Sequence, residues 1–565
     1  MTNSNNSEDL PSRSGGTNHT PPDLKQAFLS RNQTRFVEAV NRFNRTHDAG
    51  PAGIFAALFA QQWLEREIHP AWRGAVLAVS RNPEHQWLAR LLAESSSPSA
   101  LVAAFLDHWT QQPVENPKAQ AIAAWRAAHP ADPQGAVLDD WRALGIVHTP
   151  LQQRIRHIQL AQKETSQEMG GSADRERIAR IDTLPTPDDL PPWSKVGFIP
   201  RMACSQSCRH CQFVWRDPMK NLPDPMPTLH WIDQTTQSLL FTGGELHDQL
   251  PLFERTIREL PHIRAFAILL NGATTTTLEE AESIFHALDE ARRVRPKQSA
   301  PPEVILQVSF DEYHQEILVN RDGTLHERIP VANIANLLQI APRHPKIRLV
   351  LLHKQTRLNL SGAILEKGVI ARLQQELLAR GLTLHPLRHA VSPRHKQDPV
   401  DPTRTMPVIR DLMFVLSSHP EQPIHLMSST IDAFGRASLL DRSEFIQERG
   451  LLNDLLQHGQ THGERFDIDP MIRADGIVTC FGATHLWMGD LSREPRETVR
   501  ARFVKDPLLA ALARFDRRLI DLHREIATDT DRILATASGP HHVFHQLTET
   551  ADARRHLTQR LLATL

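Results

Sequence analysis

Residues 204–211 read CSQSCRHC and contain three of the four cysteines in this chain of 565 residues. Three residues separate Cys204 from Cys208, and two separate Cys208 from Cys211. Thiolates at this spacing can all bind one metal centre. A mononuclear zinc site takes four protein ligands, whereas three thiolates on a 4Fe–4S cubane leave one iron open. The odd number of thiols therefore favours an iron–sulfur cluster with a free coordination position.

Two apolar runs lie close to this segment. Residues 196–200 (VGFIP) end in a proline, which is typical of a buried strand that opens into a loop. Residues 239–245 (LLFTGGE) form a second run that ends in two glycines and Glu245. Glycine has no side chain to block a close approach of its backbone to a ligand. The sequence therefore predicts two strands. Taken alone, the Gly-Gly-Glu segment would usually mark a turn, and its place at the end of a strand about thirty residues after Cys211 favours a ligand site.

The cysteine spacing and the Gly-Gly-Glu segment together resemble the radical S-adenosylmethionine (SAM) superfamily. The residue before the third cysteine is normally aromatic in that family, and here it is His210. The resemblance implies that the cysteine loop lies at the carboxyl end of the first strand of a barrel. It implies that one 4Fe–4S cluster is held by Cys204, Cys208 and Cys211, and that the amino group of SAM is bound by Gly243, Gly244 and Glu245.

A zinc site remains an alternative, with Cys480 or His210 as the fourth ligand. The flanking Gly-Gly-Glu segment has no role in a zinc site, which weighs against it.

Strands and helices alternate after the cysteine loop. Alternation of this kind predicts a parallel sheet with right-handed crossovers, in an α/β fold. Six such units resemble the partial (β/α)6 barrel of the radical SAM family rather than a closed barrel of eight. The expected elements are strands at 265–271, 304–310 and 347–352, a candidate sixth strand at 383–387, and helices at 278–293 and 363–380, the latter stopped by Gly381.

Polar residues follow these strands. By the same resemblance, Ser309 and Asp311 contact the ribose and methionine parts of SAM, and Asn271 assists. Arg436, in a Gly-Arg-Ala segment, is expected near the adenine. Each of them can equally be a helix cap or a turn former. Tyr313, the only tyrosine in the chain, is a candidate relay for a hydrogen atom.

The fourth cysteine follows Asp475 and Gly476 in residues 474–480 (ADGIVTC). This segment resembles the start of a SPASM extension, a region that normally binds auxiliary clusters through many cysteines. One cysteine cannot hold such a cluster, so we expect a degenerate SPASM-like hairpin and helix that cap the barrel. Cys480 is then either a buried small hydrophobe or a thiol that donates a hydrogen atom to a substrate radical. Residues 494–565 read as two or three helices.

The composition excludes several classes of protein. The formal net charge is −1 and the pI is about 7.2, so no basic surface indicates nucleic acid or an anionic membrane. No apolar run approaches the roughly twenty residues that span a bilayer. The polar N-terminus lacks the layout of a signal peptide. Three clustered free thiols require a reducing compartment, which predicts a cytoplasmic, metal-binding protein.

The chain is longer than one barrel requires. We expect a disordered tail (1–21), a helical domain (22–169), a charged, proline-rich linker (170–192), the barrel (193–440) and the SPASM-like cap with terminal helices (441–565). The helical domain also contains carboxylate–imidazole spacings suited to iron, at Glu65 with His69 and at Glu84 with His85. Recognition of a substrate or partner protein is the alternative role for that domain.

The resemblance implies an enzyme that reductively cleaves SAM to a 5′-deoxyadenosyl radical, which abstracts a hydrogen atom from substrate. A flavodoxin- or ferredoxin-like protein supplies the electron. The expected substrate is a peptide or natural product that the enzyme matures. The alternatives are a small-metabolite oxidoreductase or epimerase with Cys480 as hydrogen donor, and an iron–sulfur sensor or assembly protein that does not consume SAM. The sequence leaves the substrate and the oligomeric state open.

Overall fold

The computed structural model describes residues 169–206, 208–213, 224–296, 301–319, 325–356, 368–392, 395–398, 403–440, 444, 446–459 and 465–564. The chain divides into two compact units, one comprising 1–150 with 317–326 and the other 151–316 with 327–565. The predicted tail (1–21), the helical domain up to residue 168 and the pairs Glu65/His69 and Glu84/His85 lie outside the described residues.

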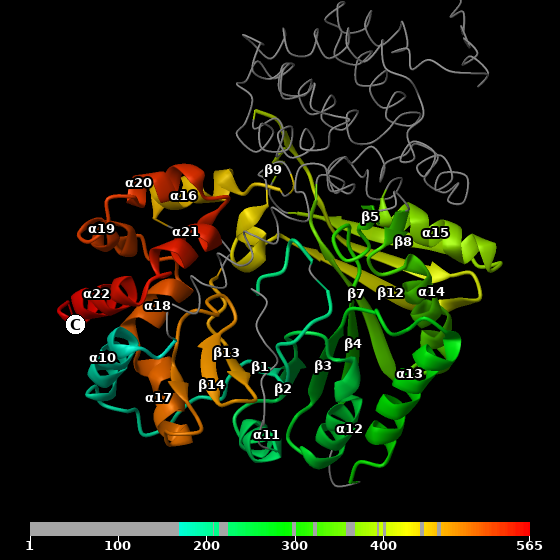
Figure 1. Ribbon diagram of the computed structural model, residues 1–565, viewed down its shortest axis with the longest axis horizontal. Coiled ribbons are helices and arrows are strands. Elements are labelled where there is room, and N and C mark those ends of the chain that lie inside the picture. Colours follow the sequence, from blue (N-terminus) through cyan, green and yellow to red (C-terminus); the bar gives the residue numbers. More distant parts are fainter. Residues whose placement is uncertain are drawn as a thin grey trace, which may run out of the picture. The chain divides into compact units, whose positions relative to one another are not determined.

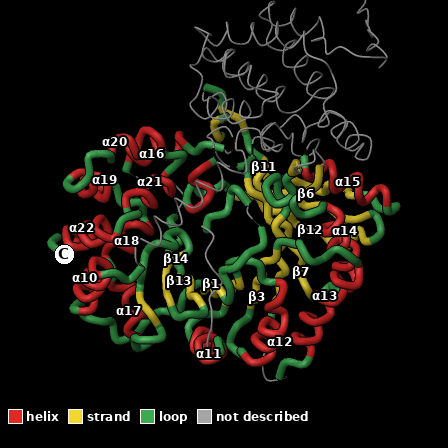
Figure 2. The backbone as a smooth tube through the Cα atoms, viewed as in Figure 1, coloured by secondary structure: helices red, strands yellow, loops and turns green. Residues whose placement is uncertain are grey.

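An eleven-stranded sheet forms the centre of the second unit, in the order β15-β14-β13-β1-β2-β3-β4-β7-β12-β11-β8 (Figures 1 and 2). Seven consecutive strands, from β13 to β12, run parallel to their neighbours. The fold is therefore α/β with a mostly parallel sheet. The parallel strands that follow one another in the chain are β1 (Val196–Ile199), β2 (Ser238–Phe241), β3 (Ala265–Leu270), β4 (Glu303–Ser309), β7 (Ile347–Lys354) and β12 (His419–Ser429).

The first five of these strands were predicted from their apolar runs, and the structure confirms them. β1 is buried at every position, as expected of a strand covered on both faces, and β3 alternates between buried and partly buried residues. The main hydrophobic core includes Phe198, Phe241 and Phe266 from three adjacent strands.

Helices connect the parallel strands, and α12, α13, α14 and α15 pack in series along the sheet (Figures 1 and 2). The predicted helix at 278–293 is confirmed as α13, which begins with a capping box between Thr277 and Glu280. Gly381 follows α15 with φ +74°, the left-handed conformation expected of a residue that stops a helix. The connecting helices are α11 (Met226–Asp233), α12 (Leu250–Glu259), α13 (Leu278–Arg293), α14 (Val331–Ile340) and α15 (Val369–Ala379).

The predicted sixth strand is in a different place. Residues 384–387 of this segment belong to β8 (Leu384–Val391), which lies at the edge of the sheet and pairs antiparallel with β11 (Ile409–Leu416). The sixth parallel position, beside β7, is taken by β12. Pro386 lacks an N–H to donate, which is compatible with the place of β8 at the edge of the sheet.

The expected hairpin is present near the C-terminus. β13 (Pro470–Arg473) and β14 (Ile477–Cys480) pair antiparallel, and Gly476 turns between them with φ +94°. β13 also pairs in parallel with β1, so the hairpin extends the sheet at the β1 edge, and β15 (Gly489–Asp490) follows β14.

The prediction of two or three helices after residue 494 is wrong. Six short helices are present, because Pro507 and Pro540 each begin a new helix and Phe515 turns the chain with φ +51°. The first of them contacts the segment that follows the hairpin, where Arg502 donates to the carbonyl of Met488 at 2.9 Å. These helices are α17 (Arg496–Lys505), α18 (Pro507–Ala513), α19 (Arg518–Arg524), α20 (Thr530–Thr536), α21 (Pro540–Leu547) and α22 (Ala551–Leu562).

Several shorter elements complete the described structure. They are α16 (Arg449–His458), β5 (Ile317–Val319) paired with β6 (Leu325–Glu327), β9 (Lys396–Gln397) paired with β10 (Thr405–Met406), and the 3₁₀ helices η2 (His247–Gln249), η3 (Ala341–Arg343) and η6 (Gly435–Leu439). None of the described helices is both long enough and apolar enough to cross a membrane.

The segment predicted as a linker, 170–192, contains a packed helix. α10 (Ser172–Asp182) contacts α17 and α22. Its Arg177 is fully buried, donates to Asp506 at 2.5 Å and to the carbonyl of Trp487 at 2.6 Å. Some of the charged residues that favoured a linker thus form buried ion pairs with the C-terminal helices.

Replacing Asp506 by alanine should strongly destabilise the packing of α10 against the C-terminal helices. In the described structure, Asp506 is the only charged partner of the buried Arg177. Removing one partner of a buried pair typically costs about 3–5 kcal/mol. Unfolding in urea, followed by tryptophan fluorescence, measures the loss. Asp521→Ala, which breaks the exposed pair with Arg524, is the control and should change stability little. Equal stability of the two variants would contradict a structural role for the buried pair.

Candidate functional site

The cysteine loop follows β1 directly, at the carboxyl edge of the parallel strands. The segments after β2 and β3 and the end of β4 lie at the same edge, because parallel strands end together. Ligands of open parallel sheets bind outside this edge. The sequence-predicted residues at these strand ends are Glu245, Asn271, Ser309 and Asp311.

The three thiols of the loop differ in exposure. Cys208 is 4% exposed, and Cys204 and Cys211 are partly buried. Burial raises the pKa of Cys208 to about 12 and also raises the pKa of Cys204. The charge that Cys211 would carry raises the pKa of both other thiols further. A bound metal would supply the positive charge that favours their thiolate forms.

The spacing of the sulfur atoms bears on the zinc alternative. Sulfurs bound to tetrahedral zinc at about 2.3 Å stand about 3.8 Å apart. In the described part of the chain, only His210, Asp311 and His314 form a group of three or more candidate ligands whose atoms all lie within 4.8 Å of one another. The three thiols do not form such a group in the described structure.

The Gly-Gly-Glu segment contacts the backbone of the cysteine loop. Gly244 donates its N–H to the carbonyl of Arg201 at 2.9 Å, and Glu245 donates to that of Ala203 at 2.8 Å. Gly243 has φ +133°, and a Cβ on Gly244 would clash with the carbonyl oxygen of Ala203. The two glycines were expected to admit a ligand. In the structure the close neighbour is the cysteine loop itself.

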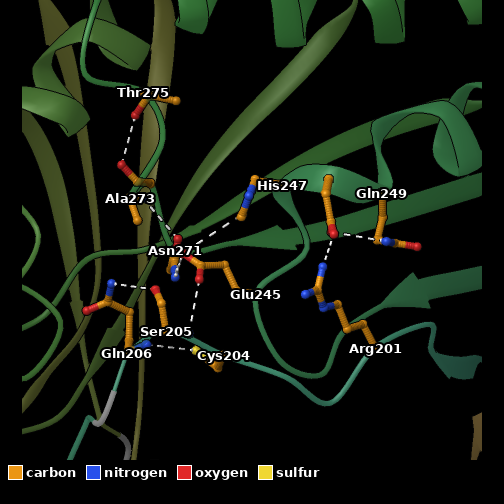
Figure 3. A network of polar contacts seen from close by, with 12 residues as sticks. Arg201, Cys204, Ser205, Gln206, Glu245, His247, Gln249, Asn271, Ala273 and Thr275 are labelled. Carbon is orange, nitrogen blue, oxygen red and sulfur yellow. Dashed lines mark hydrogen bonds and ion pairs between the residues drawn. The ribbon is translucent and has the colours of Figure 1, made fainter. Parts of the chain in front are cut away.

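The carboxylate of Glu245 joins three segments (Figure 3). It accepts hydrogen bonds from the N–H of Ser205 at 3.1 Å and from Asn271 Nδ2 at 3.2 Å, and His247 lies 3.9 Å away. Burial alone would raise the pKa of Glu245, but these hydrogen bonds and His247 lower it below its usual value. Glu245 therefore carries a negative charge beside the cysteine loop.

The Gly-Arg-Ala segment holds the other end of the same loop. Ala437 donates its N–H to the carbonyl of Cys211, and Arg436 Nε donates to that of Phe213, each at 3.2 Å. Gly435 has φ +59°, and a Cβ there would clash with the carbonyl of Gln212. Arg436, predicted near an adenine, is 4% exposed and is placed against the cysteine loop.

Arg209, which lies between two of the cysteines, is buried in an ion-pair network. Its Nε donates to Glu316 at 2.9 Å, and its Nη1 donates to Glu444. Glu316 also accepts from Arg328 at 2.7 Å. Burial would lower the pKa of Arg209, but Glu316 and Glu444 raise it well above its usual value. The network ties the cysteine loop to Glu316, after β4, and to Glu444, and no sequence pattern predicted it.

His210 and Tyr313 stack with their ring centroids 4.7 Å apart. Tyr313 is 3% exposed, and its hydroxyl donates to the carbonyl of Glu444 at 2.8 Å. His210 Nε2 lies 3.5 Å from Asp311 Oδ2, and burial lowers the pKa of His210 well below its usual value. The hydroxyl predicted to relay a hydrogen atom is thus engaged with the backbone of a neighbouring segment.

Asp311 is buried with both carboxylate oxygens in use. Oδ1 accepts the N–H groups of Tyr313 and His314, each at 2.9 Å, and Oδ2 lies 3.0 Å from His314 Nδ1. Burial would raise the pKa of Asp311, and His314 and His210 lower it below its usual value. Ser309 is buried at the end of β4, beside Leu352 of β7.

Two histidines at this edge were missed by the sequence interpretation. His314 follows Asp311 closely, and His353 lies at the end of β7, 1% exposed. Burial lowers the pKa of His353 to about 4. One sequence pattern could have indicated His353. It stands with Lys354 directly after the apolar run 347–352, where a parallel strand was expected to end.

Cys480 lies on β14, fully buried in the main hydrophobic core. Burial raises the pKa of its thiol well above the usual value. These are the surroundings of a packed core residue, and they give a substrate no described route to the thiol.

Replacing Gly244 by alanine should lower the amount of iron that the protein incorporates, because the new methyl group must displace the carbonyl of Ala203 and with it the cysteine loop. Iron per chain after anaerobic reconstitution measures the effect. Gly450→Ala, in α16 with nothing within 4 Å of the added Cβ, is the matched control and should incorporate iron normally. Normal iron content in Gly244→Ala would show that the close contact is dispensable.

Replacing Arg209 by alanine should destabilise the cysteine loop, because Glu316 and Glu444 would share a buried site with less positive charge. The expected loss is about 3–5 kcal/mol in the free energy of unfolding, with reduced iron content. Urea unfolding and iron analysis measure both. The control Arg518→Ala breaks an exposed pair with Asp516 and should leave both unchanged. If Arg209→Ala matched that control, the buried network would not support the loop.

Comparisons with known proteins do not assign this chain to a family. A scan against models of protein families and a search of curated proteins found no match to the chain. The functional assignment accordingly depends on the cysteine loop at 204–211 and on the segments that contact it.

Proposed function

We propose that this protein is a radical SAM enzyme. The observation that carries the proposal is the convergence of two segments, 243–245 and 435–437, on one loop that holds three cysteines. The cysteine spacing and the Gly-Gly-Glu segment are two separate features of the radical SAM resemblance. Their contact in space supports the view that they serve a single site.

In this proposal Cys204, Cys208 and Cys211 hold one 4Fe–4S cluster, and the fourth iron is open to SAM. When bound and reduced, the cluster supplies the electron that cleaves SAM into methionine and a 5′-deoxyadenosyl radical. The protein positions the cofactors and excludes side reactions.

Glu245 is the side chain best suited to the amino group of SAM. Its pKa is lowered, so it is an anion near neutral pH, and it lies against the cysteine loop. Asn271 orients this carboxylate from β3. Gly243 and Gly244 keep the segment close to the loop, Ser309 lies on β4 at the same edge of the sheet, and Arg436 supports the loop from the opposite end.

We further propose that the six consecutive parallel strands from β1 to β12 form the partial (β/α)6 barrel of this family. The hairpin β13–β14 then corresponds to a SPASM-like extension that binds no auxiliary cluster, since Cys480 is the only cysteine there and is buried in the core. The core position favours a packing role for Cys480 over hydrogen donation.

For the reaction outcome, maturation of a peptide or natural product is the first candidate, with a flavodoxin- or ferredoxin-like reductant. A small-metabolite oxidoreductase or epimerase with Cys480 as donor is less favoured, because the thiol is fully buried. An iron–sulfur sensor or assembly protein is the candidate outside enzymes. A sensor or assembly protein would not consume SAM, whereas both enzyme candidates would.

The proposal is tested by anaerobic reconstitution with iron and sulfide, followed by dithionite and SAM. The wild-type chain should bind about four irons and accumulate 5′-deoxyadenosine and methionine even without substrate. Cys208→Ala should lose both the cluster and the products, because two thiolates cannot replace three.

Cys480→Ala is the control for thiol loss as such, and it should retain iron and form 5′-deoxyadenosine. Bound zinc in place of iron, or product formation by Cys208→Ala at the wild-type rate, would refute the proposal. A bound cluster without SAM cleavage would leave the sensor or assembly role as the better assignment.

A further inference from the structure

A second group of candidate ligands lies beside the cysteine loop and contains no thiol. His210, Asp311 and His314 place one ligand atom each within 4.8 Å of one another. Their elements are far apart in the chain: His210 comes from the loop after β1, and the other two follow β4. The fold, rather than a local motif, therefore assembles two imidazoles around one carboxylate.

The distances suit direct coordination. Asp311 Oδ2 lies 3.0 Å from His314 Nδ1 and 3.5 Å from His210 Nε2. Ligands at about 2.1 Å from one first-row metal ion stand about 3.0–3.5 Å apart in octahedral or tetrahedral geometry. An ion could thus be bound between Asp311 and either imidazole with little movement, and the two imidazole nitrogens lie within 4.8 Å of each other.

The backbone already orients the carboxylate. Oδ1 of Asp311 accepts two backbone N–H groups, which directs Oδ2 toward both imidazoles. Tyr313 stacks on His210 and restricts the rotation of that ring. Outer contacts that fix the orientation of ligating side chains are typical of metal sites.

The charge balance leaves a place for a cation. Asp311 is 1% exposed, and in the described structure its ion-pair partners within 4 Å are histidines alone. A buried carboxylate normally requires a charged partner or a metal. Among the described residues, the neighbouring His210 Nδ1 and His353 Nε2 are both buried without a hydrogen-bond partner.

We propose that His210, Asp311 and His314 form a mononuclear site for a divalent transition-metal ion, of the class of Fe²⁺, Co²⁺ or Zn²⁺. Two imidazoles with one carboxylate are a ligand set typical of non-haem iron, and imidazole suits zinc as well. Three protein ligands leave coordination positions open for a small anionic or oxygen-bearing ligand.

This site goes beyond the proposed function and does not depend on it. It uses no cysteine, and it assigns His210 and Asp311 to the metal in place of the contacts with SAM that the family resemblance implies. The SAM contacts proposed on the Glu245 side of the loop are unaffected.

The test uses the full chain with Cys204, Cys208 and Cys211 all changed to alanine, so that no thiol of the loop can bind metal. Co²⁺ is titrated anaerobically and followed by its visible d–d absorption, with Zn²⁺ as competitor. The triple variant should bind Co²⁺, and adding His314→Ala or Asp311→Asn should each remove one equivalent of bound ion. Zn²⁺ should also raise the melting temperature of the triple variant, since a ligand that binds only the folded state stabilises it.

His262→Ala in the same background is the matched control, because His262 pairs with Asp233 at 2.6 Å outside this group. It should retain the full stoichiometry. If Asp311→Asn fails to fold, His314→Ala decides the matter, since His314 is more exposed, at 17%. Undiminished Co²⁺ binding in His314→Ala, or no Co²⁺ binding by the triple variant, would show that these residues form only a hydrogen-bonded pair with a stacked neighbour.

Discussion

The candidate site depends on hydrogen bonds to the carbonyl groups of the cysteine loop. Gly244 and Glu245 donate to the carbonyls of Arg201 and Ala203, before and at the start of the loop, and Ala437 donates to Cys211 at its end. These bonds form only because glycines at 243, 244 and 435 let one backbone lie directly against another. The conformation of the loop is thus set by segments that are thirty to more than two hundred residues away.

Buried charge adds a second constraint. Arg209 inserts between Glu316 and Glu444, so the loop is fixed from its inner side as well as through its backbone. A buried charge of this kind stabilises one arrangement strongly only while every partner is present. At the neighbouring strand ends, His210, whose pKa is lowered by burial, and His314 lie beside the carboxylate of Asp311. The carboxyl edge of the sheet therefore combines a rigid thiol loop with a compact group of nitrogen and oxygen ligands.

Much of the fold could be predicted from local pattern. The five apolar runs that became β1, β2, β3, β4 and β7 and the helix α13 were predicted from local pattern, because burial and turn chemistry act within a few residues. The hairpin at Gly476 was expected from the SPASM resemblance. The position of the sixth parallel strand could not be predicted from local pattern, because it depends on which segment pairs with β7. The number of C-terminal helices and the packing of α10 could not be predicted either. Charged residues of α10 are buried against partners that are distant in the sequence.

By itself the sequence determined the residues on which the proposed function depends: three thiols at fixed spacing, a Gly-Gly-Glu segment at the end of a strand, and a single remaining cysteine. Only the tertiary structure decided what those residues touch. It placed the glycines against the cysteine loop, buried Cys480 in the core and brought His210 to Asp311 and His314. Spacing along the chain limits which side chains can meet locally, whereas contacts between strand ends depend on the order of strands in the sheet, which no local pattern encodes.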